Sequence, residues 1–288
     1  MMAQPPAQVS LIHRARAAFH NDLLARRLLS LTDGVPSNAD KDSPYSVAVA
    51  SEILRQLPHG VSTLPKRLPG QTAGALFEQA IRSYIEQTFP SLAHLRPGKW
   101  TFPSNQKEIA RYEQYAHLDE LEKLALENSE LAVAIGRNYM IEPDVVIVRY
   151  PEDDSVINSE EWIVDENVAR RTTMRAANGA KPCLHASISC KWTLRNDRAQ
   201  NARSEALILI RNRKGRLPHT VLVTAEPFPP RLASLALGTG DLDCVYHFAL
   251  PELMNAVARN EVAANLVNVM VEGKRLRDIG DLPLDLAL

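Results

Sequence analysis

The sequence contains IEPDVVIV at residues 141–148 and LHASISCKW at residues 184–192, and both segments have the length and composition of β-strands. The β-branched run from Val145 to Val148 suits a strand that is buried on both faces. In the second segment polar and apolar residues alternate, which is the period of a half-exposed strand and places Ser189 and Lys191 on one face. We therefore expect a β-sheet in the second half of the chain.

Around these strands, the spacing of apolar residues predicts a helical N-terminal part, residues 1–140, and an α/β part, residues 141–288, within one domain that spans residues 1–288. We expect helices at residues 10–31, 47–56, 75–89, 109–126, 130–136, 196–212, 251–260 and 262–271. Further strands are expected at residues 162–164, 220–225 and 243–248, and a loop rich in proline and glycine at residues 57–74.

The composition excludes several classes of protein. Hydrophobic residues make up 45% and charged residues 23% of the chain, and the sequence has no apolar run of the about 18 residues that a membrane span needs. The opening residues MMAQPPAQVSLIHRARAAF lack the apolar stretch of a secretory signal, so we expect a cytoplasmic protein. Cys183, Cys190 and Cys244 have no metal-ligand spacing, and we expect reduced, mostly buried thiols. Core packing explains the neighbouring Cys183 and His185 better than a metal site does.

The charges are unevenly distributed. The net charge is −1, yet eight basic residues and only two acids lie between Lys191 and Arg216. This run predicts a local cationic face that binds nucleic acid, although a solvated helix face is the other interpretation. Within it, the segment from Arg195 to Arg198 stands at the predicted start of a helix, where arginine can bond to guanine and aspartate to cytosine in the major groove. Alternatively, Asp197 caps the helix and pairs with the arginines.

Residues suited to phosphodiester hydrolysis flank the two strands. Pro143-Asp144 begins the first strand and Ser189-Cys190-Lys191 ends the second, which is the arrangement of a PD-(D/E)xK nuclease core, except that Ser189 replaces an acid. Glu205, fourteen residues after Lys191, can supply the missing carboxylate if its helix packs beside the strand. We predict that Asp144 and Glu205 hold metal and that Lys191 orients the attacking water. The alternative is that both acids are structural.

Longer strings in the sequence carry a resemblance to a known family. They are HASISCKWTLRNDRAQNARSE at residues 185–205, RNRKGRLPH at 211–219 and GTGDLDCVYHFAL at 238–250, with VPSNAD, LPGQTAG, EIARYEQYAH and DLPLDLAL elsewhere. Together with Pro143-Asp144 they resemble the NgoMIV-like type II (type IIF) restriction endonucleases of the CCGG group, in the PD-(D/E)xK superfamily. The resemblance covers nearly the whole chain. It implies a restriction-endonuclease-like fold, with a central mixed β-sheet flanked by helices.

The resemblance also implies roles for individual residues. It implies a pair of Mg²⁺ ions held by Asp144, Glu205 and the main chain of Cys190, with Glu78 as a supporting acid and Ser189 beside Lys191. For DNA recognition, it implies that Arg195, Asp197 and Arg198 read the CCGG core, that Asp40 and Arg231 read the outer base pair, and that Gln71 faces the minor groove.

These roles imply a bacterial enzyme that cleaves double-stranded DNA at GCCGGC, after the first G, and leaves 5′ overhangs. The resemblance further implies a homotetramer, a dimer of dimers that engages two DNA sites, and a companion DNA methyltransferase. Two other classes stay open: a noncatalytic sequence-specific DNA-binding protein, and a structure-selective nuclease, which would need little of the base readout that Arg195 to Arg198 offers. A thiol hydrolase that uses Cys190 has no histidine at a suggestive spacing.

Overall fold

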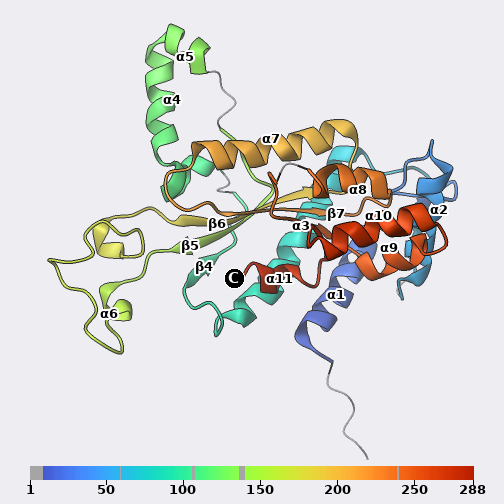
Figure 1. Cartoon of the computed structure of the whole chain (residues 1–288), viewed down its shortest axis with the longest axis horizontal. Helices are drawn as coiled ribbons and strands as arrows, with labels where there is room; N and C mark the ends of the chain where they lie inside the picture. The colour runs from blue at the N-terminus through green and yellow to red at the C-terminus, as the bar shows by residue number, and fades with distance from the viewer. Residues whose placement is uncertain (1–8, 59, 106–107, 136–139, 239) are drawn as a thin grey trace, which may run out of the picture.

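A six-stranded sheet forms the centre of the protein in a computed structural model, which describes residues 9–58, 60–105, 108–135, 140–238 and 240–288. The strand order is β4-β5-β6-β7-β8-β9 (Figure 1). The strands are β4 (Lys99–Thr101), β5 (Val145–Tyr150), β6 (Cys183–Lys191), β7 (His219–Thr224), β8 (Cys244–His247) and β9 (Leu276–Asp278). The pairs β4–β5 and β5–β6 are antiparallel, whereas the strands from β6 to β9 run parallel. The sheet is therefore mixed, as predicted.

Helices flank this sheet, and α7 lies along one face with α1 and α3 along the other (Figure 1). The α-helices are α1 (Leu11–Ala25), α2 (Pro44–Gln56), α3 (Gly70–Thr88), α4 (His117–Glu127), α5 (Ser129–Ile135), α6 (Asp154–Ile157), α7 (Asn196–Asn212), α8 (Pro229–Ala236), α9 (Leu250–Val257), α10 (Glu261–Glu272) and α11 (Leu282–Asp285). Short 3₁₀ turns are η1 (Phe89–Leu92), η2 (Ile109–Arg111), η3 (Glu113–Tyr115) and η4 (Ala176–Asn178). The predicted α/β class with helices on both faces is confirmed.

The central strands are buried on both faces. Val145 and Ile147 of β5 belong to the larger hydrophobic cluster, whereas Val146 and Val148 belong to a second cluster on the opposite face. The prediction of a doubly buried strand is thus confirmed for β5.

The prediction that the strand at residues 184–192 is half-exposed is wrong. Ser187 and Ser189 of β6 are only 6% and 7% exposed. β6 lies between β5 and β7, and its Ser189 bonds to Glu205 of α7, which therefore lies over the face that carries Ser189. Alternation in this strand therefore reflects a polar site under a helix and not contact with solvent.

Several predicted bounds are wrong. The first helix ends at Ala25, because the segment Ser30–Thr32 forms β1, which pairs with β2 (Val35–Pro36) and β3 (Ser62–Thr63) in a small separate sheet. The segment at residues 162–164 is irregular, and its Trp162 is 79% exposed. The helix expected at residues 109–126 begins only at His117, after two 3₁₀ turns. The expected end of the next helix at Gly136 lies outside the described residues.

Both parts of the chain contribute to the sheet and to its core. β4 comes from the first 140 residues and pairs with β5, and the larger hydrophobic cluster includes residues of α1 and α3 as well as of β7 and β8. This mixing supports one domain over residues 1–288, which stays a prediction. In the described part of the chain, every helix is too short or too polar to cross a membrane.

Candidate active site

The predicted residues on the two strands lie together at one end of the sheet. Asp144 comes directly before β5, and Lys191 is the last residue of β6. Because β5 and β6 are antiparallel and Val145 pairs with Ile188, the start of β5 lies beside the end of β6. There Asp144 Oδ2 accepts hydrogen bonds from the backbone N–H of Cys190, at 2.7 Å, and from Lys191 Nζ, at 2.9 Å.

Glu205 reaches the same point from α7. Its Oε1 lies 3.9 Å from Lys191 Nζ, and its Oε2 accepts a hydrogen bond from Ser189 Oγ at 3.3 Å. Burial raises the pKa of Glu205, and the positive charge of Lys191 opposes that shift. Ser189 therefore stands where the PD-(D/E)xK pattern has an acid, and it bonds to the acid that the helix supplies.

Lys191 is an ammonium group between two carboxylates. Its side chain is 15% exposed. Burial disfavours its charged form, but Asp144 and Glu205 outweigh burial and raise the pKa of Lys191 above the ordinary value. The two acidic neighbours of Lys191 therefore favour its charged, ammonium form.

Glu78 is connected to the site through Arg82, which the sequence analysis did not single out. Both residues lie on α3, and Arg82 Nη2 donates to Glu78 Oε1 at 3.0 Å and to the backbone oxygen of Asp144 at 3.5 Å. The spacing of four residues between an acid and an arginine on a predicted helix is the signal that could have identified Arg82.

The residues present fit a magnesium ion. Asp144 and Glu205 supply hard carboxylate oxygens, and their side chains are 26% and 32% exposed, so that a hydrated ion can approach them. The described residues contain no cluster of three or more His, Cys, Asp or Glu side chains that could hold a metal ion, so the site offers only these two carboxylates. Mg²⁺ usually keeps several waters and needs only one or two carboxylates together with substrate phosphate. Two acids beside an expected phosphate suit Mg²⁺ better than a metal that requires a closed protein cage.

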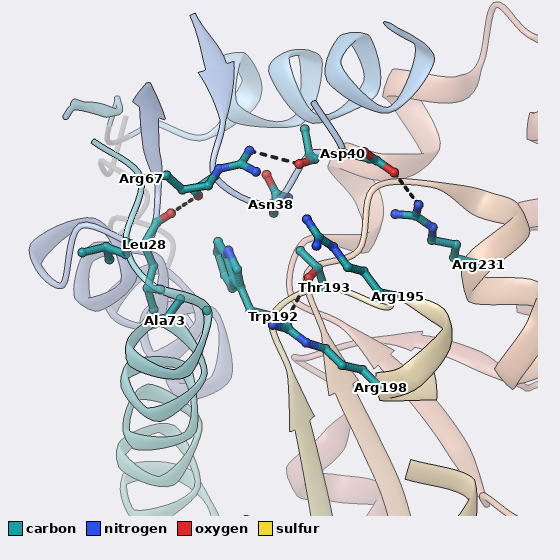
Figure 2. Close-up of a pocket in the computed structure, with 14 residues that line it drawn as sticks. Leu28, Asn38, Asp40, Arg67, Ala73, Trp192, Thr193, Arg195, Arg198 and Arg231 are labelled. Atoms are coloured by element: carbon teal, nitrogen blue, oxygen red, sulfur yellow. Dashed lines mark hydrogen bonds and ion pairs between the residues drawn. The ribbon is translucent and has the colours of Figure 1, made fainter. Parts of the chain in front are cut away.

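A polar pocket of about 180 Å³ opens beyond the end of β6 (Figure 2). Its lining includes Trp192 and Thr193, which directly follow Lys191, and four of the residues predicted to read DNA. These four are Arg195, Arg198, Asp40 and Arg231. The structure thus brings residues that are far apart in the sequence to one surface beside the acids.

Polar contacts hold the predicted readers in place. Arg231 Nη2 forms an ion pair with Asp40 Oδ2, and Arg198 Nη1 donates to Thr193 Oγ1 at 2.9 Å. The guanidinium of Arg231 lowers the pKa of Asp40, which keeps this carboxylate ionised. Arg195 points toward the loop that carries Asp40 (Figure 2).

Asp197 and Gln71 are not part of the pocket lining and are exposed in the first turns of α7 and α3. The two turns are close, because a Cβ added at Gly70 would lie 2.9 Å from Arg198 Nη2. Helix α7 spans the predicted residues 196–212, and its N-cap residue is Arg195. Asp197 lies inside the helix and does not cap it.

Sequence reasoning missed two residues that hold the loop carrying Asp40. Arg67 Nη2 donates to the backbone oxygens of Pro36 and Ala39, at 2.6 and 3.0 Å, and Asn38 Nδ2 donates to that of Ala225 at 2.8 Å. These contacts join segments that are distant in sequence, so no local spacing indicates them.

The two ends of the basic run lie at different places in the structure. Arg195 and Arg198 lie at the first turn of α7, whereas Arg216 lines a different pocket, near Cys183 at the start of β6. With 17 residues, α7 separates the two ends by about 25 Å. In that second pocket, His185 packs against Trp100 with ring centroids 4.8 Å apart, which supports core packing for His185.

Comparisons with known proteins agree with this geometry. Residues 19–288 match the family described as NgoMIV restriction enzyme. The chain is also 52% identical over 285 residues to the type II restriction enzyme NgoMIV of Neisseria gonorrhoeae, across 96% of this chain and 99% of that protein. The chain therefore belongs to the NgoMIV restriction enzyme family and is a type II restriction enzyme, a site-specific deoxyribonuclease.

Proposed function

We propose that this enzyme cleaves duplex DNA at GCCGGC, after the first G, and leaves 5′ overhangs. The observation that carries the proposal is the position of the acids and the lysine beside the pocket of predicted readers. Asp144, Lys191 and Glu205 lie together at the end of β6, and the residue after Lys191, Trp192, lines the pocket. A duplex seated on this pocket would have its backbone close to the three charged groups.

The chemistry proposed here is hydrolysis by in-line attack of water on the scissile phosphate, giving 5′-phosphate and 3′-hydroxyl ends. Type II restriction enzymes generally depend on Mg²⁺. Asp144, Glu205 and the main chain of Cys190 would hold Mg²⁺, as a pair of ions, which would polarise the phosphate and make the water more acidic. The ammonium of Lys191 would orient the water by hydrogen bonding and stabilise charge that develops on the phosphate.

Supporting roles follow from the contacts around these groups. Glu78 fixes Arg82, which in turn contacts the main chain of Asp144. Ser189 restrains one oxygen of Glu205 and leaves the other toward Lys191. Both contacts would reduce the motion of the acids before substrate binds.

Base recognition is proposed to come from both sides of the pocket. Arg195, Asp197 and Arg198 at the start of α7 would read the CCGG core, because arginine bonds guanine and aspartate accepts from cytosine. The facing pair, Asp40 and Arg231, would read the outer G·C pair with the same chemistry. Gln71, exposed on the neighbouring turn of α3, would face the minor groove.

The proposal extends to the assembly and its setting. Family resemblance supports a homotetramer that binds two DNA sites, a companion methyltransferase that protects the host, and action in the bacterial cytoplasm. A noncatalytic binding protein and a structure-selective nuclease are set aside, because the chain belongs to a family of type II restriction enzymes.

Mapping of cut ends tests the cleavage site. Purified enzyme with Mg²⁺ is incubated with a plasmid library, and the ends are sequenced for the wild type, for Asp144→Asn and for Asp22→Asn. Asp22 on α1 is the matched control, since it pairs with Arg26, the C-cap residue of that helix. We expect cuts only at GCCGGC, with loss of cutting in Asp144→Asn alone. Cuts at a different sequence that contains CCGG would refute the outer readers, and cutting by Asp144→Asn at the wild-type rate would refute the proposed active site.

A further inference from the structure

Glu226 is a buried acid outside the predicted site, and it contacts Arg231 and the backbone beside Arg195, two of the predicted readers. It follows β7 and is 0% exposed. Its Oε2 accepts a hydrogen bond from the backbone N–H of Leu194 at 2.7 Å, and its Oε1 accepts one from that of Phe228 at 3.1 Å. Leu194 directly precedes Arg195, whereas Phe228 is the N-cap residue of α8. One carboxylate thus ties the start of α7 to the start of α8.

The same carboxylate faces the proposed reader on α8. Arg231 Nη1 lies 3.7 Å from Glu226 Oε1, while Nη2 of the same guanidinium pairs with Asp40. Arg231 therefore lies between two acids that come from different parts of the chain. A movement of Glu226 would displace Arg231 relative to Asp40.

We propose that Glu226 is a positioning residue for specificity, which couples the reading of the CCGG core to the reading of the outer base pair. The inference rests on the proposed function, because that function assigns Arg195 to the core and Arg231 with Asp40 to the outer pair. A buried carboxylate with hydrogen bonds at both oxygens transmits a shift of Leu194 to the start of α8, and it transmits a shift of α8 to Leu194. Binding of the correct core would thereby favour the correct placement of Arg231.

Only a group that accepts hydrogen bonds at both ends fits this position. In Glu226→Gln the shape is kept, but one oxygen becomes an NH₂ donor. That donor must face either the N–H of Leu194 or the N–H of Phe228 and the guanidinium of Arg231, so one of the two connections is lost. Glu226→Asp keeps both acceptors and the charge, but its side chain is one methylene shorter and cannot reach both partners.

The test is a ratio of cleavage efficiencies measured on the full-length enzyme with Mg²⁺. For the wild type and for each variant, kcat/KM is measured on duplexes that carry GCCGGC and on matched duplexes that carry ACCGGT, TCCGGA or CCCGGG. The ratio is kcat/KM on GCCGGC divided by kcat/KM on the altered duplex, and both values come from one preparation. A lower folded fraction of the variant therefore cancels, and a purely structural role leaves the ratio unchanged. Glu252→Gln is the matched control, since Glu252 pairs with Arg16 through both oxygens, at 3.1 and 2.6 Å.

We expect Glu226→Gln and Glu226→Asp to lower the preference for GCCGGC over the altered outer pairs by about tenfold, the loss of roughly one good base contact. The control should keep the wild-type ratio. An unchanged ratio in both Glu226 variants, with a wild type that prefers GCCGGC, would overturn the role of Glu226 and leave the proposed function intact. A wild type that does not distinguish the outer pairs would overturn both.

Discussion

Replacement of Lys191 with alanine is expected to remove cleavage and to leave DNA binding nearly unchanged. Nζ of Lys191 lies 2.9 Å from Asp144 Oδ2 and 3.9 Å from Glu205 Oε1, so the ammonium stands beside the two proposed metal ligands. The side chain is 15% exposed, which limits screening by water. The predicted readers line the adjacent pocket and do not include Lys191. The loss should therefore fall on the chemical step.

The size of the effect follows from Coulomb's law for an ammonium and a phosphate about 4 Å apart. At an effective dielectric constant of about 20, two unit charges about 4 Å apart interact by about 4 kcal/mol. Since about 1.4 kcal/mol corresponds to a tenfold change in rate, a full charge on the phosphate in the transition state would give about 10³-fold. The charge that develops there is only partial, and removal of one preorganised donor in other enzymes costs about 10²- to 10³-fold. We expect a loss on the order of 10²- to 10³-fold, within these limits.

Single-turnover cleavage of a labelled GCCGGC duplex in Mg²⁺ measures the chemical step, and titration of the same duplex without divalent metal measures binding. Lys123→Ala is the matched control, because Lys123 is an exposed lysine that pairs only with Asp119 among the ion pairs of the described residues. A loss of less than tenfold for Lys191→Ala would refute the reasoning. So would a loss of binding as large as the loss of cleavage.

Three further changes test neighbouring parts of the structure. Arg198→Ala should weaken binding to GCCGGC by about 1–3 kcal/mol and leave binding to unrelated DNA nearly unchanged, as measured by titration; equal weakening on both would contradict a base contact. Arg82→Ala should slow single-turnover cleavage by about 10- to 100-fold at unchanged affinity for DNA, because Arg82 contacts Glu78 and the main chain of Asp144. A wild-type rate of cleavage would disprove this supporting role of Arg82. Burial raises the pKa of Glu226 to about 7 from 4.5, so the folded protein binds a proton between these pH values that the unfolded chain does not. This contribution to the free energy of unfolding is complete below pH 4.5 and is lost as the pH rises through 7, by about 3 kcal/mol in all. Urea unfolding at pH 5 and pH 8 measures the decline, and the free energy of unfolding should fall less between these pH values in Glu226→Gln than in the wild type.

The proximity of Asp144, Lys191 and Glu205 could be predicted because each part of the arrangement has a local signal. The β-branched run after Asp144 marks a buried strand, and the alternation before Lys191 marks another. Once the two strands pair in antiparallel fashion, the start of one must lie beside the end of the other. The helix that carries Glu205 needs only to pack on the polar face of the second strand. The structure brings these three residues within hydrogen-bond or ion-pair distance.

The contacts that support the pocket could not be predicted, because they join distant segments. Glu226 bonds to Leu194, and Asn38 bonds to Ala225, across separations of 32 and 187 residues. Neither pair has a spacing that distinguishes it from a chance combination of polar residues. The basic run shows the same limit, since its spacing along the chain does not indicate that α7 carries its two ends to different pockets.

In the proposed mechanism, the serine at position 189 explains why catalysis and recognition would share one helix. An acid at this position would hold metal from the strand alone, and α7 would then serve recognition only. With Ser189, the second carboxylate comes from Glu205, seven residues after Arg198 on α7, which places their Cα atoms about 10 Å apart along the helix axis. Any tilt of α7 that improves the contact of Arg198 with a base therefore also moves Glu205 relative to Lys191. Cleavage can thus depend on whether the proposed readers contact the correct bases, and no separate mobile segment is needed for this dependence.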